Sequence, residues 1–276
     1  MNTFKPRFID SHVHMDHVEE ENPERIAWFK AKGCVTVSWA LSSRIESVED
    51  LNAYLEAQAD LIQKLNKSGL PCYFLTGIHP RSIPSQIKVN EVDILLNPFL
   101  ENPYCLGLGE IGLETGHSKE KIVFAEQLAL ASKLKNKGIR IGIHTPRNNK
   151  VEITFEILRV LNSYPGLEQI IVIDHCSSEN IGYVLKAGYW AGVTLSPVKA
   201  SFHDLKKIIE RYPDRLNKIM CNTDSGTGFY DDLYRLSRLS DEGPFSADTI
   251  RNLTWDNAYT FFNLESTLEG NLKKLP

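Results

Sequence analysis

The chain has 276 residues, of which 42% are hydrophobic and 24% charged, a composition typical of a globular protein with a substantial core. Its formal net charge of −4 provides no global basic field for a polyanion, and no apolar run is long enough to cross a bilayer. The five cysteines never form a Cys-x-x-Cys pair and the first residues lack the apolar core of a signal peptide, so we expect reduced thiols in a cytoplasmic protein with no membrane partner.

Eight short apolar runs are predicted to be strands because they are rich in β-branched and aromatic residues. They cover residues 8–14, 34–40, 71–78, 104–110, 139–144, 169–175, 189–196 and 218–224. Residues 19–22 are predicted to form a loop. Helical spacing or helix boundary residues predict helices over 23–33, 47–69, 89–100, 118–137, 151–161, 178–186, 203–211 and 230–272, the last with a turn at 243–244.

The alternation of strands and helices determines the predicted fold class. Strands that alternate with helices form a parallel sheet. Eight such units in about 250 residues are typical of an α/β protein with a closed (β/α)8 TIM barrel. Because no linker, low-complexity segment or repeat interrupts the chain, we expect a single domain over residues 1–276. The alternative is a doubly wound open sheet, which would place the strand ends in a line rather than in a ring.

The predicted strands end on residues that bind metals. His12 and His14 end the first strand, and both rings point the same way because alternate side chains of a strand share a face. The ends of the fourth, fifth, sixth and eighth strands carry Glu110, His144, His175 and Asp224. The active site of a (β/α)8 barrel lies at the carboxyl ends of its strands. We therefore expect these six side chains to converge there.

Four imidazoles and two carboxylates suit two divalent ions, with zinc as the expected metal and manganese, iron or magnesium as alternatives. The expected ligands are His12, His14 and Asp224 for one ion, His144 and His175 for the other, and Glu110 as the bridge between them. Two ions about 3.5–4 Å apart lower the pKa of a shared water, which would attack as a bridging hydroxide. Asp224 is the predicted general base for that water, so Glu110 and Asp224 are the predicted catalytic residues.

Motifs along most of the chain, from Ile9 to about Phe262, resemble those of the TatD family of metal-dependent hydrolases in the amidohydrolase superfamily. The motifs occur in the family's order and read FIDSHVHMD, TGIHP, GLGEIGLE, VFAEQLALA, IGIHTPR, VIDHCS, CNTDSG and NLTWDNAYTFF. The most specific are Gly109-Glu110-Ile111-Gly112 and the helical pattern of Phe124, Gln127, Leu130 and Ala131.

The resemblance implies a TIM barrel. It also implies, for each predicted ligand, the same role that its place at a strand end predicts. It implies that His12 and His14 are the first-strand ligands and that Glu110 is the bridging carboxylate. It implies that His144 and His175 bind the second metal and that Asp224 is the catalytic aspartate. It also implies that His79 contacts the substrate, such as a phosphate. Arg81 and Arg147 follow the third and fifth strands and are candidates to bind a phosphate in bidentate fashion.

Four loop segments depart from the family pattern. They are Leu113-Glu114-Thr115 after the fourth strand, Thr145-Pro146-Arg147 after the fifth, Cys176-Ser177 after the sixth and Gly226 after Ser225. Because such loops set substrate choice, the sequence indicates a divergent subgroup with intact metal chemistry and an altered pocket. Asp16 is a candidate to orient a liganding histidine, Asp174 a residue that caps or orients, and His17 and His117 are expected to be solvated.

Three functions are compatible with these residues. The first is hydrolysis of a phosphoester, with a small molecule, a nucleotide or a nucleic-acid end as substrate and deoxyribonuclease activity undecided. The second is hydrolysis of a lactone, ester or amide, which the same ligands serve in the wider superfamily. The third is a non-catalytic metal-bound scaffold. The sequence does not predict the oligomeric state.

Overall fold

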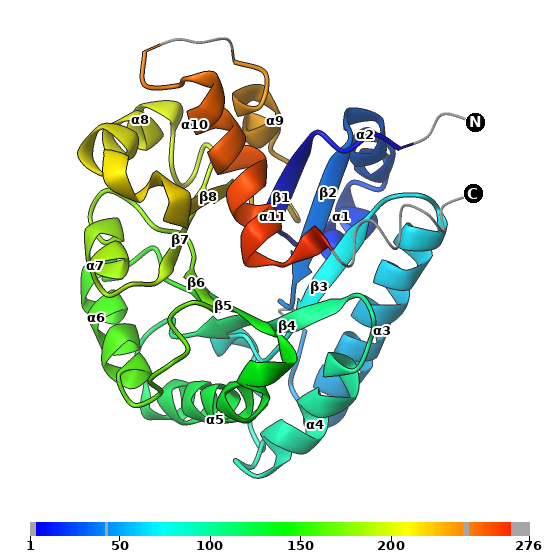
Figure 1. Ribbon diagram of the computed structural model, residues 1–276. Helices are drawn as coiled ribbons and strands as arrows, with labels where there is room; N and C mark the ends of the chain where they lie inside the picture. The colour runs from blue at the N-terminus through cyan, green and yellow to red at the C-terminus, as the bar shows by residue number, and fades with distance from the viewer. Residues whose placement is uncertain (1–3, 42–43, 240–242, 266–276) are drawn as a thin grey trace. The chain divides into compact units, whose positions relative to one another are not determined.

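The computed structural model of the protein describes residues 4–41, 44–239 and 243–265, in which strands alternate with helices (Figure 1). The strands are β1 (Phe8–Val13), β2 (Cys34–Trp39), β3 (Cys72–Thr76), β4 (Cys105–Gly112), β5 (Arg140–His144), β6 (Ile171–Ile173), β7 (Trp190–Thr194) and β8 (Ile219–Asn222). They form one eight-stranded sheet in chain order. A doubly wound sheet reverses its strand order part-way, so that alternative is wrong and the (β/α)8 barrel is confirmed.

Helices of very different length connect the strands. The α-helices are α1 (Met15–Glu21), α2 (Glu24–Lys32), α3 (Val48–Lys67), α4 (Glu91–Leu100), α5 (Ser118–Leu134), α6 (Lys150–Leu161), α7 (Ile181–Lys186), α8 (Phe202–Arg211), α9 (Asp232–Leu236), α10 (Ala247–Arg251) and α11 (Asn257–Phe261). Short 3₁₀ segments lie at η1 (Pro80–Ser82), η2 (Lys135–Lys137) and η3 (Pro213–Lys218), and the segment η4 (Asn252–Asp256) is a π-helical turn. Within the residues described, no helix is long and apolar enough to cross a membrane.

Several predicted strand ends are wrong, and β1 already stops at Val13, one residue before His14. β6 stops at Ile173 and β8 at Asn222, because His175 and Asp224 have φ angles of 57° and 53°, a left-handed conformation that a strand cannot contain. β4 instead continues past Glu110 to Gly112. His14, His175 and Asp224 therefore lie just after a strand, and Glu110 lies inside one.

The predicted helices differ at the two ends of the chain. The loop expected at residues 19–22 is mostly the end of α1, which begins directly after His14. The C-terminal helical region is divided into α9, α10, the π-helical turn and α11. Its predicted last residues, 266–272, lie outside the described part of the chain.

Contacts divide the chain into two compact units. Unit 1 consists of Met1–Ser38, Leu61–Tyr73 and Gly192–Pro276, and unit 2 of Trp39–Asp60 and Phe74–Ala191. The expectation of a single domain over 1–276 stays a prediction.

In unit 1, backbone hydrogen bonds connect the end of β1 to the segment that follows β8. The N–H of His14 donates to the carbonyl of Ser225 at 2.7 Å, and the N–H of Asp224 donates to the carbonyl of His12 at 2.9 Å. Between these bonds, Val13 and Ser225 form a parallel bridge. The pairing of the end of β1 with the segment after β8 thus places His12, His14 and Asp224 next to one another.

In unit 2, a close approach of side chain to backbone requires glycine in β5. A Cβ atom on Gly142 would lie 2.4 Å from the ring of Trp39, which is itself 1% exposed. β4 and β5 are parallel neighbours, with Gly112 opposite His144 and an irregular register between Leu108 and Ile111. Glu110 of β4 therefore lies two residues before the position opposite His144.

The cysteines are free, as the sequence predicted. Cys34, Cys72, Cys176 and Cys221 are buried, and burial raises the pKa of Cys72 to about 12. The thiol of Cys72 is therefore protonated and weakly nucleophilic at neutral pH.

Candidate metal centre

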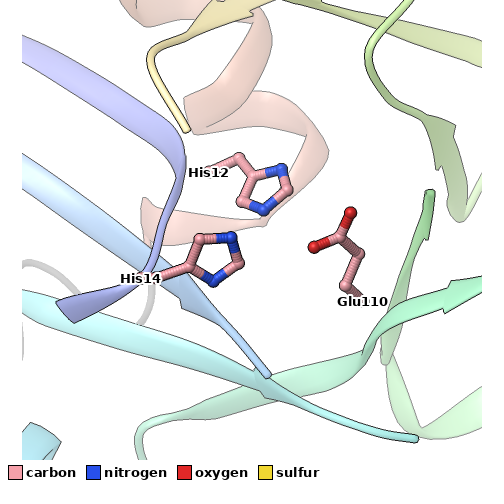
Figure 2. A group of neighbouring side chains, drawn as sticks. All are labelled: His12, His14 and Glu110. Atoms are coloured by element: carbon pink, nitrogen blue, oxygen red, sulfur yellow. The ribbon is translucent and has the colours of Figure 1, made fainter. Parts of the chain in front are cut away.

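In unit 1, two imidazoles meet one carboxylate. His12 and His14 project from the end of β1 (Figure 2), are 0% and 3% exposed, and have ring centroids 4.9 Å apart. The Nε2 atom of His14 lies 2.9 Å from Oδ1 of Asp224, and that of His12 lies 3.6 Å from the same oxygen. The predicted ligands of the first ion are thus brought together around Asp224 Oδ1.

A buried hydrogen-bond network holds the segment that carries Asp224. The carboxylate of Asp10 accepts hydrogen bonds from the N–H of Thr223 at 3.0 Å and from its hydroxyl at 2.6 Å. The hydroxyls of Thr223 and Ser225 are 2.7 Å apart, and the N–H of Tyr230 donates to Ser225 Oγ at 3.1 Å. Burial raises the pKa of Asp10 to about 7 despite these bonds. Side chains on both sides of Asp224 therefore fix its unusual backbone conformation.

In unit 2, three imidazoles surround one oxygen of Glu110, the β4 carboxylate in Figure 2. Oε1 of Glu110 lies 2.5 Å from Nδ1 of His144, 3.1 Å from Nε2 of His175 and 3.6 Å from Nε2 of His79. Glu110 is 1% exposed, and the three histidines are also buried. His79, Glu110 and His144 each offer a ligand atom within 4.8 Å of the others, which makes this group a candidate metal site.

His144 lies between two carboxylates. Its Nδ1 faces Glu110, and its Nε2 lies 2.7 Å from Oε2 of Glu114. Burial opposes the charged ring, but the two carboxylates outweigh it and raise the pKa of His144, while the hydrogen bond from His144 lowers the pKa of Glu114. Glu120 of α5 fixes the loop that carries Glu114, since its carboxylate accepts the N–H groups of Glu114, Thr115 and Gly116.

His175 is oriented by its neighbours. Its Nδ1 lies 3.5 Å from Oδ2 of the buried Asp174, and Lys150 Nζ donates to its backbone carbonyl at 2.8 Å. Metal-binding histidines commonly have such a carboxylate on the second ring nitrogen. The orienting role suggested for Asp174 therefore fits the geometry.

The hydrogen bonds of His79 distinguish it from the other histidines. Its Nδ1 accepts the N–H of Arg81 at 3.0 Å, so in the neutral ring the proton is on Nε2. Burial lowers the pKa of His79 to about 4, with Glu110 opposing the shift. Gln127 of α5 fixes the preceding residue, because its amide accepts from the N–H and donates to the carbonyl of Ile78 at 2.8 and 3.1 Å. A neutral ring with a fixed Nε2–H is suited to donate a hydrogen bond rather than to bind a cation.

The other candidate residues are placed less centrally. Arg81 is exposed, with its Nε 3.7 Å from Glu114 Oε2, and Arg147 is exposed after β5. Asp16 Oδ2 lies 3.9 Å from Nε2 of the partly exposed His17. The predicted role of Asp16, to orient the ring of His12 or His14, stays a prediction. His117 is exposed before α5, as expected.

Three residues near the ligands were not predicted as functional: Lys199, Glu114 and Gln127. Lys199 pairs with Oδ2 of Asp224. A single lysine in a loop has no periodic pattern that would identify it. Glu114 was noted only as a departure from the family pattern, and Gln127 only as part of a helical motif.

The donor atoms of both groups fit a divalent metal. Imidazole nitrogen together with carboxylate oxygen suits zinc, manganese or iron. In each group a negatively charged oxygen already faces two or more ring nitrogens within 3.6 Å.

A family model described as TatD related DNase matches residues 9–263. The chain belongs to this TatD family. Among the relatives of this TatD-family protein is an uncharacterised metal-dependent hydrolase of Methanocaldococcus jannaschii, 27% identical over 234 residues, which are 83% of this chain and 88% of the relative. The TatD membership and this relative identify the protein as a TatD-type metal-dependent hydrolase.

Solved structures support the fold of the TatD-family chain. A TatD-like protein of Archaeoglobus fulgidus superposes with a TM-score of 0.73 at 24% identity, over 93% of this chain and all (100%) of the other. A β-aspartyl dipeptidase of Fervidobacterium islandicum superposes with a TM-score of 0.59 at 15% identity, over 94% of this chain and 75% of the other. At these identities the two structures show a shared fold and nothing more.

Proposed function

We propose that this TatD-family hydrolase cleaves a phosphoester bond with two divalent ions, zinc foremost. The proposed ligands are His12, His14, Glu110, His144, His175 and Asp224. The observation that carries the proposal is the arrangement in unit 2, where imidazole nitrogens of His144 and His175 lie 2.5 and 3.1 Å from one oxygen of Glu110. The description of the family as DNase-related supports a phosphoester as the bond that is cleaved.

The ligands divide between the ions as the sequence predicts. His12, His14 and Asp224 would hold one ion and His144 with His175 the other, and the bridging role of Glu110 stays a prediction. When bound, divalent ions lower the pKa of a coordinated water and neutralise charge on the substrate's oxygens. Asp174 and Glu114 would orient the second-ion histidines by accepting their remaining ring N–H groups.

The protein's own groups account for proton transfer and substrate binding. A carboxylate oxygen of Asp224 accepts the proton of the attacking water. The water oxygen forms a bond to phosphorus as the bond from phosphorus to the leaving oxygen breaks. His79 donates its Nε2–H to a phosphate oxygen, because its Nδ1 is already occupied by the N–H of Arg81. Arg81 and Arg147 are exposed enough to reach the more distant part of a phosphorylated substrate.

The test is a substrate panel on purified protein loaded separately with Zn²⁺, Mn²⁺ and Mg²⁺. The panel contains bis(p-nitrophenyl) phosphate, p-nitrophenyl phosphate, a DNA oligonucleotide, p-nitrophenyl acetate, a lactone and a dipeptide. His144→Ala is compared with His117→Ala, which removes an exposed histidine outside both ligand groups. We expect metal-dependent phosphoester hydrolysis that is lost in His144→Ala and retained in His117→Ala.

Each other result selects a different function. Hydrolysis confined to the acetate, the lactone or the dipeptide would refute the phosphoester proposal and favour the second function considered above. Loss of bound metal in His144→Ala without any metal-dependent hydrolysis in the wild type would favour the scaffold.

A further inference from the structure

Lys199 forms an ion pair with the second oxygen of the Asp224 carboxylate. Its ammonium pairs with Oδ2, while His14 Nε2 lies 2.9 Å from Oδ1. The Lys199 side chain is only 13% exposed, unlike most surface lysines. A cation other than a metal therefore lies directly beside the predicted general base.

The loop that carries Lys199 is ordered by backbone hydrogen bonds between β7 and α8. The N–H of Ser196 donates to the carbonyl of Ala200 at 3.3 Å, and the N–H of Ala200 donates to the carbonyl of Thr194 at 3.0 Å. Ser201 then begins α8 with a capping box. These contacts hold the backbone of Lys199, and the ion pair with Asp224 places its ammonium.

Charge balance indicates what this ammonium would bind in the metal-loaded protein. A divalent ion on His12, His14 and Asp224 would neutralise the Asp224 carboxylate. A largely buried ammonium is costly without an anion beside it. An anion that reaches this place during turnover is the substrate.

We propose that Lys199 binds the anionic group of the substrate and makes the enzyme selective for anionic phosphoesters over neutral esters. This inference rests on the proposed function. Lys199 takes part in no covalent step. When its ammonium moves from Oδ2 of Asp224 to a substrate oxygen, that carboxylate oxygen becomes available for the proton of the attacking water.

The experiment measures binding of inorganic phosphate to metal-loaded protein by calorimetry. Lys199→Met and Lys199→Gln remove the charge, Lys199→Arg retains it, and Lys207→Met removes an exposed charge from α8. We expect the Kd for phosphate to rise at least tenfold in both neutral variants, which corresponds to about 1.4 kcal/mol. The Arg and Lys207→Met variants should stay within threefold of the wild type. Metal content by mass spectrometry should be equal in all five proteins.

The outcomes separate this inference from the proposed function. Unchanged phosphate binding in fully loaded Lys199→Met and Lys199→Gln would overturn the role of Lys199, whatever the enzyme hydrolyses. Loss of metal from both neutral variants would also overturn it, since Lys199 would then act through Asp224. If phosphate binding depends on Lys199 but no phosphoester is cleaved, the anion site stands and the proposed function fails. In the panel, Lys199→Met should raise KM for bis(p-nitrophenyl) phosphate by a larger factor than KM for p-nitrophenyl acetate.

Discussion

The amide of Gln127 is expected to contribute strongly to the stability of unit 2. It is 1% exposed and makes hydrogen bonds of 2.8 and 3.1 Å to the N–H and carbonyl of Ile78. Gln127→Met preserves the volume and removes both bonds. Each of the two buried backbone groups left without a partner costs about 1–3 kcal/mol, so we expect a loss of about 2–6 kcal/mol in the free energy of unfolding.

Gln58 of α3 is a matched control. It is equally buried, at 1% exposure, but neither atom of its amide group has a hydrogen-bond partner within the described part of unit 2. Gln58→Met is therefore expected to leave stability unchanged or to raise it by about 1 kcal/mol.

Urea unfolding of the metal-free proteins measures both changes. Turnover of the loaded proteins then shows whether displacement of Ile78 also disturbs the neighbouring His79. Equal stability changes in the two variants, or no change in Gln127→Met, would refute the reasoning, because burial alone would then explain the result.

Three further predictions concern single side chains. Glu114→Gln should lower metal affinity or activity about 10–100-fold by removing the carboxylate beside His144 Nε2; calorimetric titration with Zn²⁺ checks this, and wild-type affinity would contradict it. Gly142→Ala should destabilise by about 1–3 kcal/mol in urea, because its Cβ would lie 2.4 Å from the Trp39 ring; an unchanged midpoint would show that the ring moves freely. Because burial raises the pKa of Asp10 from 3.8 to about 7, the native protein binds this proton more tightly than the unfolded chain. Metal-free protein should therefore lose stability as pH rises from about 4 to about 7, and Asp10→Asn should flatten that dependence in urea midpoints measured across the range.

The sequence predicts the fold because the spacing of hydrophobic residues differs between strands and helices and so indicates the order of both. Every predicted strand exists, and the Gly33 that was expected to end the first long helix does so with a φ of 74° and an N–H donated to Lys30. The strand ends at His175 and Asp224 could not be predicted, because a left-handed residue directly after a short strand has the same hydrophobic pattern as one more strand residue.

The candidate ligands could be named from the sequence because metal chemistry restricts residue type, whereas the residues that contact them could not. Lys199 contacts Asp224 from 25 positions away, and Glu114 contacts His144 from 30 positions away. Such pairs depend on how β7, β8 and the loop after β4 are placed, and no local pattern in the sequence encodes that placement. Glu114 was visible only as an altered loop residue.

The bonds that join β1 to the segment after β8 have a consequence for how the enzyme matures. His14 and Ser225 are separated by more than two hundred positions, yet the N–H of one donates to the carbonyl of the other at 2.7 Å. A nascent chain that has not yet emerged from the ribosome as far as Ser225 cannot bring these residues together, so the proposed metal site of His12, His14 and Asp224 can form only near the end of translation.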